Sequence, residues 1–264
     1  MLCAWAGATC SPSRSRPPGC RRGRERRRGE VRTFASTTSA LLELRDWLVE
    51  QQVSPVAMEA TGDHWRPVFY LLEHELDVIL VNARDAKAVP GRKTDVTDAG
   101  WLCQLAGCRL LRASFVPPEP IRRLRDLTRL RTLLTTERSR TAQRLEKELE
   151  DAGIKLSCVA TDIMGVSGRA MLEALIAGER DPEILAQMAK ARMRSRITDL
   201  VEALTGNFSD HHAFVCRMHL DHYDHLSRQI EHLTARIGTE IEPFQGQLTR
   251  LETIPGASAG MSPR

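Results

Sequence analysis

The sequence predicts an α/β domain that is followed by an α-helical coiled-coil region. Short apolar segments at 31–34, 56–60 and 78–81 alternate with segments at 41–48 and 63–74 whose apolar residues have helical spacing. This strand–helix–strand–helix–strand order is typical of a sheet with crossover helices. Beyond the last of these segments, apolar residues recur every three or four positions over long stretches, which indicates long helices.

Local signals define the elements of the α/β part. Residues 31–34 alternate apolar and polar side chains as a strand does, and Thr37 offers an N-cap to the helix that follows. Residues 56–60 are short and apolar and stop at Gly62, which predicts a buried strand. Residues 78–81 predict another buried strand, and this run is far too short to span a bilayer.

Helical patterns dominate the rest of the chain. Thr94 can cap a helix, and a proline-rich loop at 117–120 separates it from the next one. We expect helices at 95–105, 121–152, 171–204 and 211–242, the second of them ending before Gly153. In the last helix, apolar residues recur at spacings of three and four, which predicts a coiled coil or a helical hairpin: Tyr223, Leu226, Ile230, Leu233, Ile237 and Ile241.

The first 30 residues differ in composition from the remainder. Residues 1–32 contain nine arginines and two glutamates, a balance of +7, whereas the rest of the chain contributes −3 to the total of +4. Rich in Arg, Gly, Pro and Ser, residues 1–30 are expected to be disordered. A basic nucleic-acid-binding arm is one interpretation. We favour out-of-frame translation, because 33 arginines against 5 lysines indicate a GC-rich gene.

Cysteine usage and the absence of a leader pattern indicate a cytoplasmic protein. The seven cysteines are odd in number and form no C-x-x-C pair, so neither a disulfide framework nor a zinc site is predicted. Reduced thiols are the default in that compartment. No basic segment followed by an apolar stretch occurs at the start, so we expect neither a signal peptide nor a membrane partner.

Three carboxylates form a candidate metal site. Glu59 ends an apolar strand beside a glycine turn, at the sheet edge where open α/β folds bind ligands. Asp95 and Asp98, three residues apart at a helix start, share one face. Such oxygen ligands suit Mg²⁺ or Mn²⁺, and two ions would serve phosphodiester cleavage. Ordinary strand-end and first-turn acids are the alternative, and composition alone does not decide between them.

A family resemblance bears on that choice. Residues 56–62, Val-Ala-Met-Glu-Ala-Thr-Gly, followed by Trp65, resemble an acidic motif of the DEDD transposases of the insertion-sequence-one-ten family, relatives of the Piv DNA invertases. Residues 93–99, Lys-Thr-Asp-Val-Thr-Asp-Ala, resemble its third and fourth acidic positions. Thr253-Ile254-Pro255-Gly256 resembles the opening of the family's second domain.

The resemblance implies a fold, a chemistry and partners. It implies an RNase H-like (RuvC-like) transposase domain at 31–115 that is incomplete at its N-terminal end, a helical and coiled-coil region at 116–245, and the truncated start of a C-terminal transposase domain at 246–264. The implied activity is metal-dependent cleavage and joining of DNA strands in transposition, with Glu59, Asp95 and Asp98 as catalytic and metal-binding residues. The implied partners are DNA at the element ends and target, an element-encoded RNA, and a second copy of the chain through the coiled coil.

The chain departs from the family pattern at both ends. The family's first strand carries an aspartate, yet residues 1–30 contain none, and His64 replaces the tyrosine usual before Trp65. The family's serine nucleophile belongs to the second domain, and neither Ser258 nor Ser262 has a matching context. We therefore expect this copy to be inactive as written. Alternatives are a non-catalytic DNA- or RNA-binding dimerisation module derived from a transposase, and an unrelated nuclease that recruits another acid.

Two further patterns concern ligand binding. Residues 109–144 hold ten arginines and three acids. On a helical wheel, one side of this segment carries Arg122, Arg125, Arg129, Arg140 and Arg144. We predict that these arginines bind nucleic-acid phosphates, and the alternative is a solvated helix face. His219, His222 and His225 are spaced by three, but these steps rotate around a helix and do not converge on a metal, so a solvated face is the better interpretation.

Overall fold

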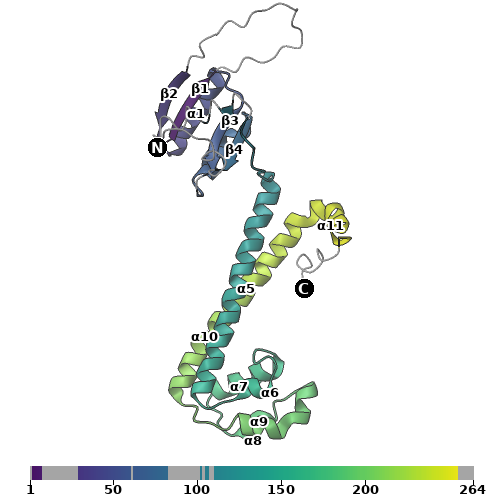
Figure 1. Ribbon diagram of the computed structural model, residues 1–264. Coiled ribbons are helices and arrows are strands. Elements are labelled where there is room, and N and C mark those ends of the chain that lie inside the picture. The colour runs from purple at the N-terminus through teal and green to yellow at the C-terminus, as the bar shows by residue number, and fades with distance from the viewer. Residues whose placement is uncertain are drawn as a thin grey trace, which may run out of the picture. The chain divides into compact units, whose positions relative to one another are not determined.

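The computed structural model describes residues 2–7, 29–60, 62–82, 102, 105, 106 and 110–254. The chain divides into two compact units, Met1–Pro117 and Pro118–Arg264. Each unit is described by itself below (Figure 1). Within the described residues, no helix combines the length and the apolar content needed to cross a bilayer.

Among the described residues, the first unit contains two small sheets. Strand β1 (Leu2–Gly7) pairs antiparallel with β2 (Gly29–Phe34), and β3 (Val56–Ala60) pairs in parallel with β4 (Val78–Asn82). A parallel pair needs a crossover connection, and α2 (Trp65–Leu72) supplies it. The sequence prediction placed 31–34 and the two later strands in one sheet; among the described strands, β2 instead shares its ladder with β1.

Strand β1 corrects the expectation that residues 1–30 are disordered throughout. Its sequence, Leu-Cys-Ala-Trp-Ala-Gly, is mostly apolar, and its backbone pairs with β2 from Leu2 opposite Phe34 to Gly7 opposite Gly29. Averaging composition over 30 residues concealed this short apolar stretch among the arginines that follow. Residues 8–28 lie outside the described part of the chain, so the prediction for them remains a prediction.

Helix α1 (Thr38–Glu50) begins where the sequence signals predict it. The Thr37 side chain accepts a hydrogen bond from the Ala40 amide, which satisfies one of the free donors of the first turn. Its apolar face, including Leu44 and Trp47, packs with α2 and the two later strands into a single core. The Phe34 ring lies 5.8 Å from that of Trp47, so β2 also contributes to this core.

A long antiparallel helix pair organises the second unit. Helices α5 (Glu119–Asp151) and α10 (Asp210–Ile241) pack side by side, as Figure 1 shows. The end of α5 follows the predicted glycine signal: Gly153 has φ +78°, and the amide of Ile154 donates to the carbonyl of Leu149. At the start of α10, Ser209 and His212 form a reciprocal capping box.

Short helices surround the end of this pair where α5 stops and α10 starts. They are α6 (Leu156–Val159), α7 (Val166–Ile176), α8 (Pro182–Ala186), the 3-10 helix η1 (Ala191–Arg196) and α9 (Ile197–Ala203). Their apolar residues join Leu145 and Leu149 of α5 and Leu220 of α10 in the largest buried cluster of the described chain. After α10 come η2 (Glu242–Phe244) and α11 (Gln245–Glu252).

Candidate acidic site and nucleic-acid interface

Glu59 is the fourth residue of β3 and lies at the carboxyl end of the parallel pair. The register places Glu59 opposite Val81 and Ala60 opposite Asn82, so the two strands end at the same edge. The Glu59 side chain is half-buried. The expected position at a strand end is therefore confirmed, and this is the edge at which α/β sheets bind ligands.

The neighbouring strand fixes the position of this edge. Leu80 and Val81 of β4 are buried, with Val81 wholly inaccessible to solvent. On the side of β4 away from β3, the Ser114 amide donates to the Leu80 carbonyl at 2.7 Å, and Ala113 forms an antiparallel bridge with Val81. Because β4 is held from both sides, the strand that carries Glu59 rests against a supported neighbour.

The other two predicted carboxylates, Asp95 and Asp98, lie outside the described residues. Whether they approach Glu59 therefore remains a prediction. Within the described part of the chain, no three His, Cys, Asp or Glu side chains gather as a metal site would require. The Glu59 carboxylate itself is the hard oxygen donor that Mg²⁺ and Mn²⁺ prefer, so it fits the role of one ligand among several.

Helix α5 has two distinct faces. One face carries the buried residues Leu124, Leu145 and Leu149, and the last two belong to the main core of the second unit. On the opposite face, four of the five predicted phosphate-binding side chains are exposed: Arg125, Arg129, Arg140 and Arg144. Arg122, the fifth, is half-buried at the start of the helix. We refer to these five residues as the arginine face.

The arginines of α5 differ in what they contact. Arg123 forms an ion pair with Glu119, one turn before it, and Arg138 lies over the Tyr223 ring of α10 at 5.7 Å. Both lie outside the arginine face. In the described chain, no carboxylate pairs with Arg125, Arg129, Arg140 or Arg144. These four cations are therefore available to an external anion.

Hydroxyl side chains occupy the middle of α5. Each donates a hydrogen bond to the carbonyl four residues earlier: Thr128, Thr132, Thr135, Thr136, Ser139 and Thr141. Their hydrogen-bonding capacity is thus used within the helix. These uncharged side chains add no charge to the arginine face, whose cations fall into a group at 122–129 and a group at 140–144.

The three spaced histidines lie on α10. His222 and His225 are exposed and His219 is half-buried. The His222 Nε2 atom is 3.6 Å from a carboxylate oxygen of Glu137 on α5, an ion pair only when the ring is protonated. The histidines thus lie along the helix pair, and one of them faces the neighbouring helix.

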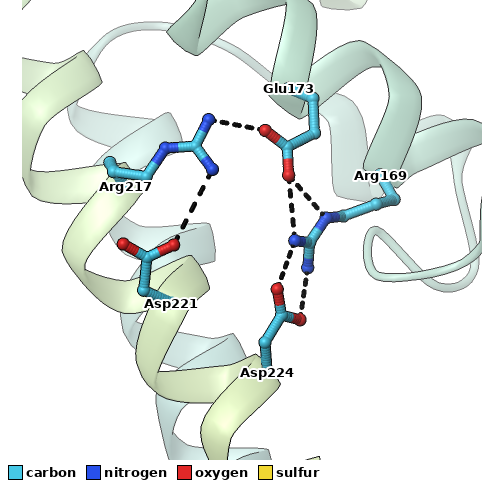
Figure 2. Close-up of polar contacts among 5 residues, drawn as sticks. All are labelled: Arg169, Glu173, Arg217, Asp221 and Asp224. Atoms are coloured by element: carbon cyan, nitrogen blue, oxygen red, sulfur yellow. Dashed lines mark hydrogen bonds and ion pairs between the residues drawn. The ribbon is translucent and has the colours of Figure 1, made fainter.

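A network of five charged residues joins α7 to α10 (Figure 2). Arg169 donates to both carboxylate oxygens of Asp224, at 2.8 and 2.5 Å, and to Glu173 at 2.9 and 3.1 Å. Arg217 donates to the other oxygen of Glu173 at 2.5 Å. Asp221 is farther away, 3.8 Å from Arg217. Glu173 therefore bridges two arginines, and Arg169 bridges two carboxylates.

Pairing shifts the titration of this network. Burial raises the pKa of Glu173, but hydrogen bonds from Arg217 and Arg169 outweigh it and hold the pKa below its usual value. The hydrogen bond to Asp224 raises the pKa of Arg169. Glu173 is thus ionised near neutral pH, and both arginines are engaged by carboxylates of the protein.

Sequence reasoning did not identify this network. The spacing of four between Arg169 and Glu173, and between Arg217 and Asp221, is a signal that local patterns contain. The contact between Arg169 and Asp224 joins residues 55 positions apart, and no local pattern specifies it. Its geometry is that of a structural tie between two helices.

Comparison with known families places this chain among transposases. Residues 23–154, half of the sequence, match the family model of the DEDD transposases of IS110 elements, which is described as a transposase family. The matched segment includes both acidic motifs and the whole of α5. No curated protein matches the chain.

Proposed function

This chain belongs to the DEDD transposases of the insertion-sequence-one-ten family, and from that premise we propose that its acidic site and arginine face are those of an enzyme for metal-dependent cleavage and joining of DNA strands. The family match over residues 23–154 carries the proposal. It spans Glu59, Asp95 and Asp98 together with the arginine face, so one matched segment holds both the candidate chemistry and the candidate DNA contact.

An RNase H-like (RuvC-like) fold of the first unit is part of the proposal. The parallel β3–β4 pair, its crossover helix α2 and the carboxylate at its carboxyl edge support it. In such an arrangement the strand fixes the backbone of Glu59 while its side chain is left at the ligand-binding edge.

Glu59, Asp95 and Asp98 would hold Mg²⁺ or Mn²⁺ in this proposal. When bound, such ions activate water and stabilise the leaving oxygen of a phosphodiester. The half-buried position of Glu59 on a supported strand suits the task, since a ligand must be held in place by its surroundings. Asp95 and Asp98 contribute by sequence position, three residues apart.

The arginine face is proposed as the DNA contact. A rise of about 1.5 Å per residue separates Arg122 from Arg144 by roughly 33 Å along the axis. That length is close to one turn of duplex DNA, about 34 Å. The exposed guanidinium groups of Arg125, Arg129, Arg140 and Arg144 would displace condensed counterions from the phosphates, which makes binding favourable and dependent on salt.

We propose further that these 264 residues, tested alone, bind nucleic acid without cutting it. The first aspartate of the family's four acids has no counterpart among residues 1–30, which contain no Asp. Fewer carboxylates hold two ions less well. A non-catalytic binding role, the alternative, is favoured by the exposed arginine face, because that face requires none of the acidic residues.

Two measurements test the proposal. The first is binding of Mn²⁺, followed by electron paramagnetic resonance, in wild type, in Glu59→Gln and in the control Glu50→Gln, an exposed residue at the end of α1. Binding that weakens about tenfold only in Glu59→Gln supports the metal site. Equal binding by all three proteins refutes the role of Glu59.

The second measurement is a strand-cleavage and rejoining assay on element-end DNA with Mg²⁺, with and without the element's RNA. We expect salt-sensitive binding and no product. Product that disappears in Glu59→Ala or in Asp95→Ala would establish the catalytic proposal and overturn the expected inactivity. Failure to bind any nucleic acid at low salt would refute the proposed DNA contact.

A further inference from the structure

Resting on the proposed nucleic-acid function, we infer that a second phosphate-binding surface lies at residues 190–196. We call it the basic turn: Lys190, Arg192, Arg194 and Arg196, all exposed, on and just before η1. It lies outside residues 23–154, the segment matched by the transposase family model. The ligand is the sugar–phosphate backbone, of either DNA or RNA.

The charge of the basic turn has no local compensation over most of its length. Between Glu183 and Asp199, residues 184–198 contain four cations and no acid. Arg196 is engaged: it donates to Asp199 at 3.0 Å and to the carbonyl of Val159 at 2.8 Å. Lys190, Arg192 and Arg194 pair with no carboxylate in the described chain. Like charges so close together repel, and an anion relieves that repulsion.

The backbone beneath these cations is held in place. The Lys190 amide donates to the buried hydroxyl of Ser167 on α7 at 2.9 Å. Ala189 before the turn and Leu200 after it are buried in the main core of the unit, and Met193 packs against that core from within the turn. The polar side chains thus point outward from a fixed backbone.

The backbone conformation of Ala191 is the one expected in a turn whose two ends are held by the core. Ala191 has φ +49°, in the left-handed region that non-glycine residues occupy at a cost of about 1 kcal/mol. Such a conformation persists where surrounding contacts determine it. A constrained turn loses little conformational entropy when a ligand binds, which favours its use as a binding surface.

The test compares three variants of the full chain. The first replaces Lys190, Arg192 and Arg194 by alanine, and the second, a control that retains charge, carries Arg192→Lys and Arg194→Lys. The third removes equal charge elsewhere through Arg228→Ala, Arg236→Ala and Arg250→Ala, at exposed positions of α10 and α11. Circular dichroism establishes that each variant folds.

Affinity for a 30-base-pair DNA duplex and for an RNA hairpin is measured over a range of salt concentrations. Loss of three phosphate contacts should lower the slope of log K against log salt by about 3 on duplex DNA. The lysine variant should keep the wild-type slope, and the charge-matched control should stay within about 1 of it. A larger loss on one of the two ligands identifies the preferred nucleic acid.

The outcomes separate this inference from the proposed function. Wild-type binding with an unchanged slope in the alanine variant overturns the inference alone. Equal losses in the alanine variant and the charge-matched control also overturn it, because net charge then explains the effect. No binding by the wild type refutes the proposed function and this inference together. Loss in the alanine variant alone supports both.

Discussion

Arginine serves two different roles in the second unit. On the outer face of α5, Arg125, Arg129, Arg140 and Arg144 are exposed and pair with no carboxylate of the described chain. Between α7 and α10, Arg169 and Arg217 are enclosed by carboxylates that they bridge. The sequence pattern does not distinguish the two groups of arginines, since all six belong to amphipathic helices. The presence of acids on the facing helix determines whether an arginine ties the fold together or remains available to a ligand.

The largest expected effect separates the two faces of α5. Leu145, with 1% of its surface exposed, and Arg144 are adjacent in sequence, but Leu145 lies in the core and Arg144 is exposed to solvent. Leu145→Ala leaves a cavity in the main core and should lower the free energy of unfolding by about 2 to 5 kcal/mol. Arg144→Ala should leave it nearly unchanged. Chemical denaturation measures both, and similar losses in both variants would contradict the two-face description.

Removing the exposed arginines should affect binding and spare stability. Replacing Arg125, Arg129, Arg140 and Arg144 by alanine should lower the affinity for duplex DNA at low salt by about 100-fold or more and reduce the salt slope by roughly 3 to 4. The midpoint of urea unfolding should not fall. The control is Arg123→Ala, which removes a cation already paired with Glu119. Unchanged DNA affinity in the fourfold variant would show that the arginine face is only solvated.

Breaking the network around Arg169 should lower stability and leave DNA binding unchanged. Asp224→Asn weakens the bidentate contact with Arg169 and should lower stability by about 1 kcal/mol, since the pair is partly exposed. Asp221→Asn is the matched control, because its carboxylate is 3.8 Å from Arg217 and largely exposed. DNA affinity should be unaffected in both. A control as unstable as Asp224→Asn would assign the loss to α10 as a whole.

The smallest effect concerns pH. Because the pKa of Glu173 is lower in the folded protein than in the unfolded chain, its contribution to stability is complete above the unfolded value. That contribution disappears as pH falls through the folded value. The stability difference between wild type and Glu173→Gln should therefore be constant near neutral pH and shrink below about pH 4.3, the usual value for Glu. Unfolding at several pH values measures it; a constant difference would contradict the lowered pKa.

Local sequence signals predicted the helices and strands, but they did not predict which strands pair with each other. Thr37, the apolar stretch at 56–60 and Gly153 each act through neighbouring residues, so α1, β3 and the end of α5 follow directly from them. The pairing of β1 with β2 joins residues 22 to 32 positions apart, in a segment whose average composition did not reveal the first strand. Strand partnership depends on what else is available to pair, and a local pattern does not contain that information.

The candidate site shows the same division. The strand-end position of Glu59 and the exposed side of α5 follow from periodicity, and the structure confirms both. The grouping of Glu59 with Asp95 and Asp98 rests on family resemblance and remains a prediction. The network around Arg169 and the basic turn near Arg192 were missed, because one depends on contacts between distant residues and the other on how α7 supports the backbone of Lys190.

The hydroxyl-rich middle of α5 has a mechanical consequence. Side-chain hydroxyls that donate to carbonyls one turn earlier, from Thr128 to Thr141, compete with the helix's own amide donors for those carbonyls. Helices with such bonds bend more readily than those with aliphatic side chains. The compliant segment lies between Arg129 and Arg140, so curvature there changes the angle between the two groups of cations. Helix α5 would in this way behave as two straight helical segments joined by a segment that bends. It could then follow a curved duplex as well as a straight one.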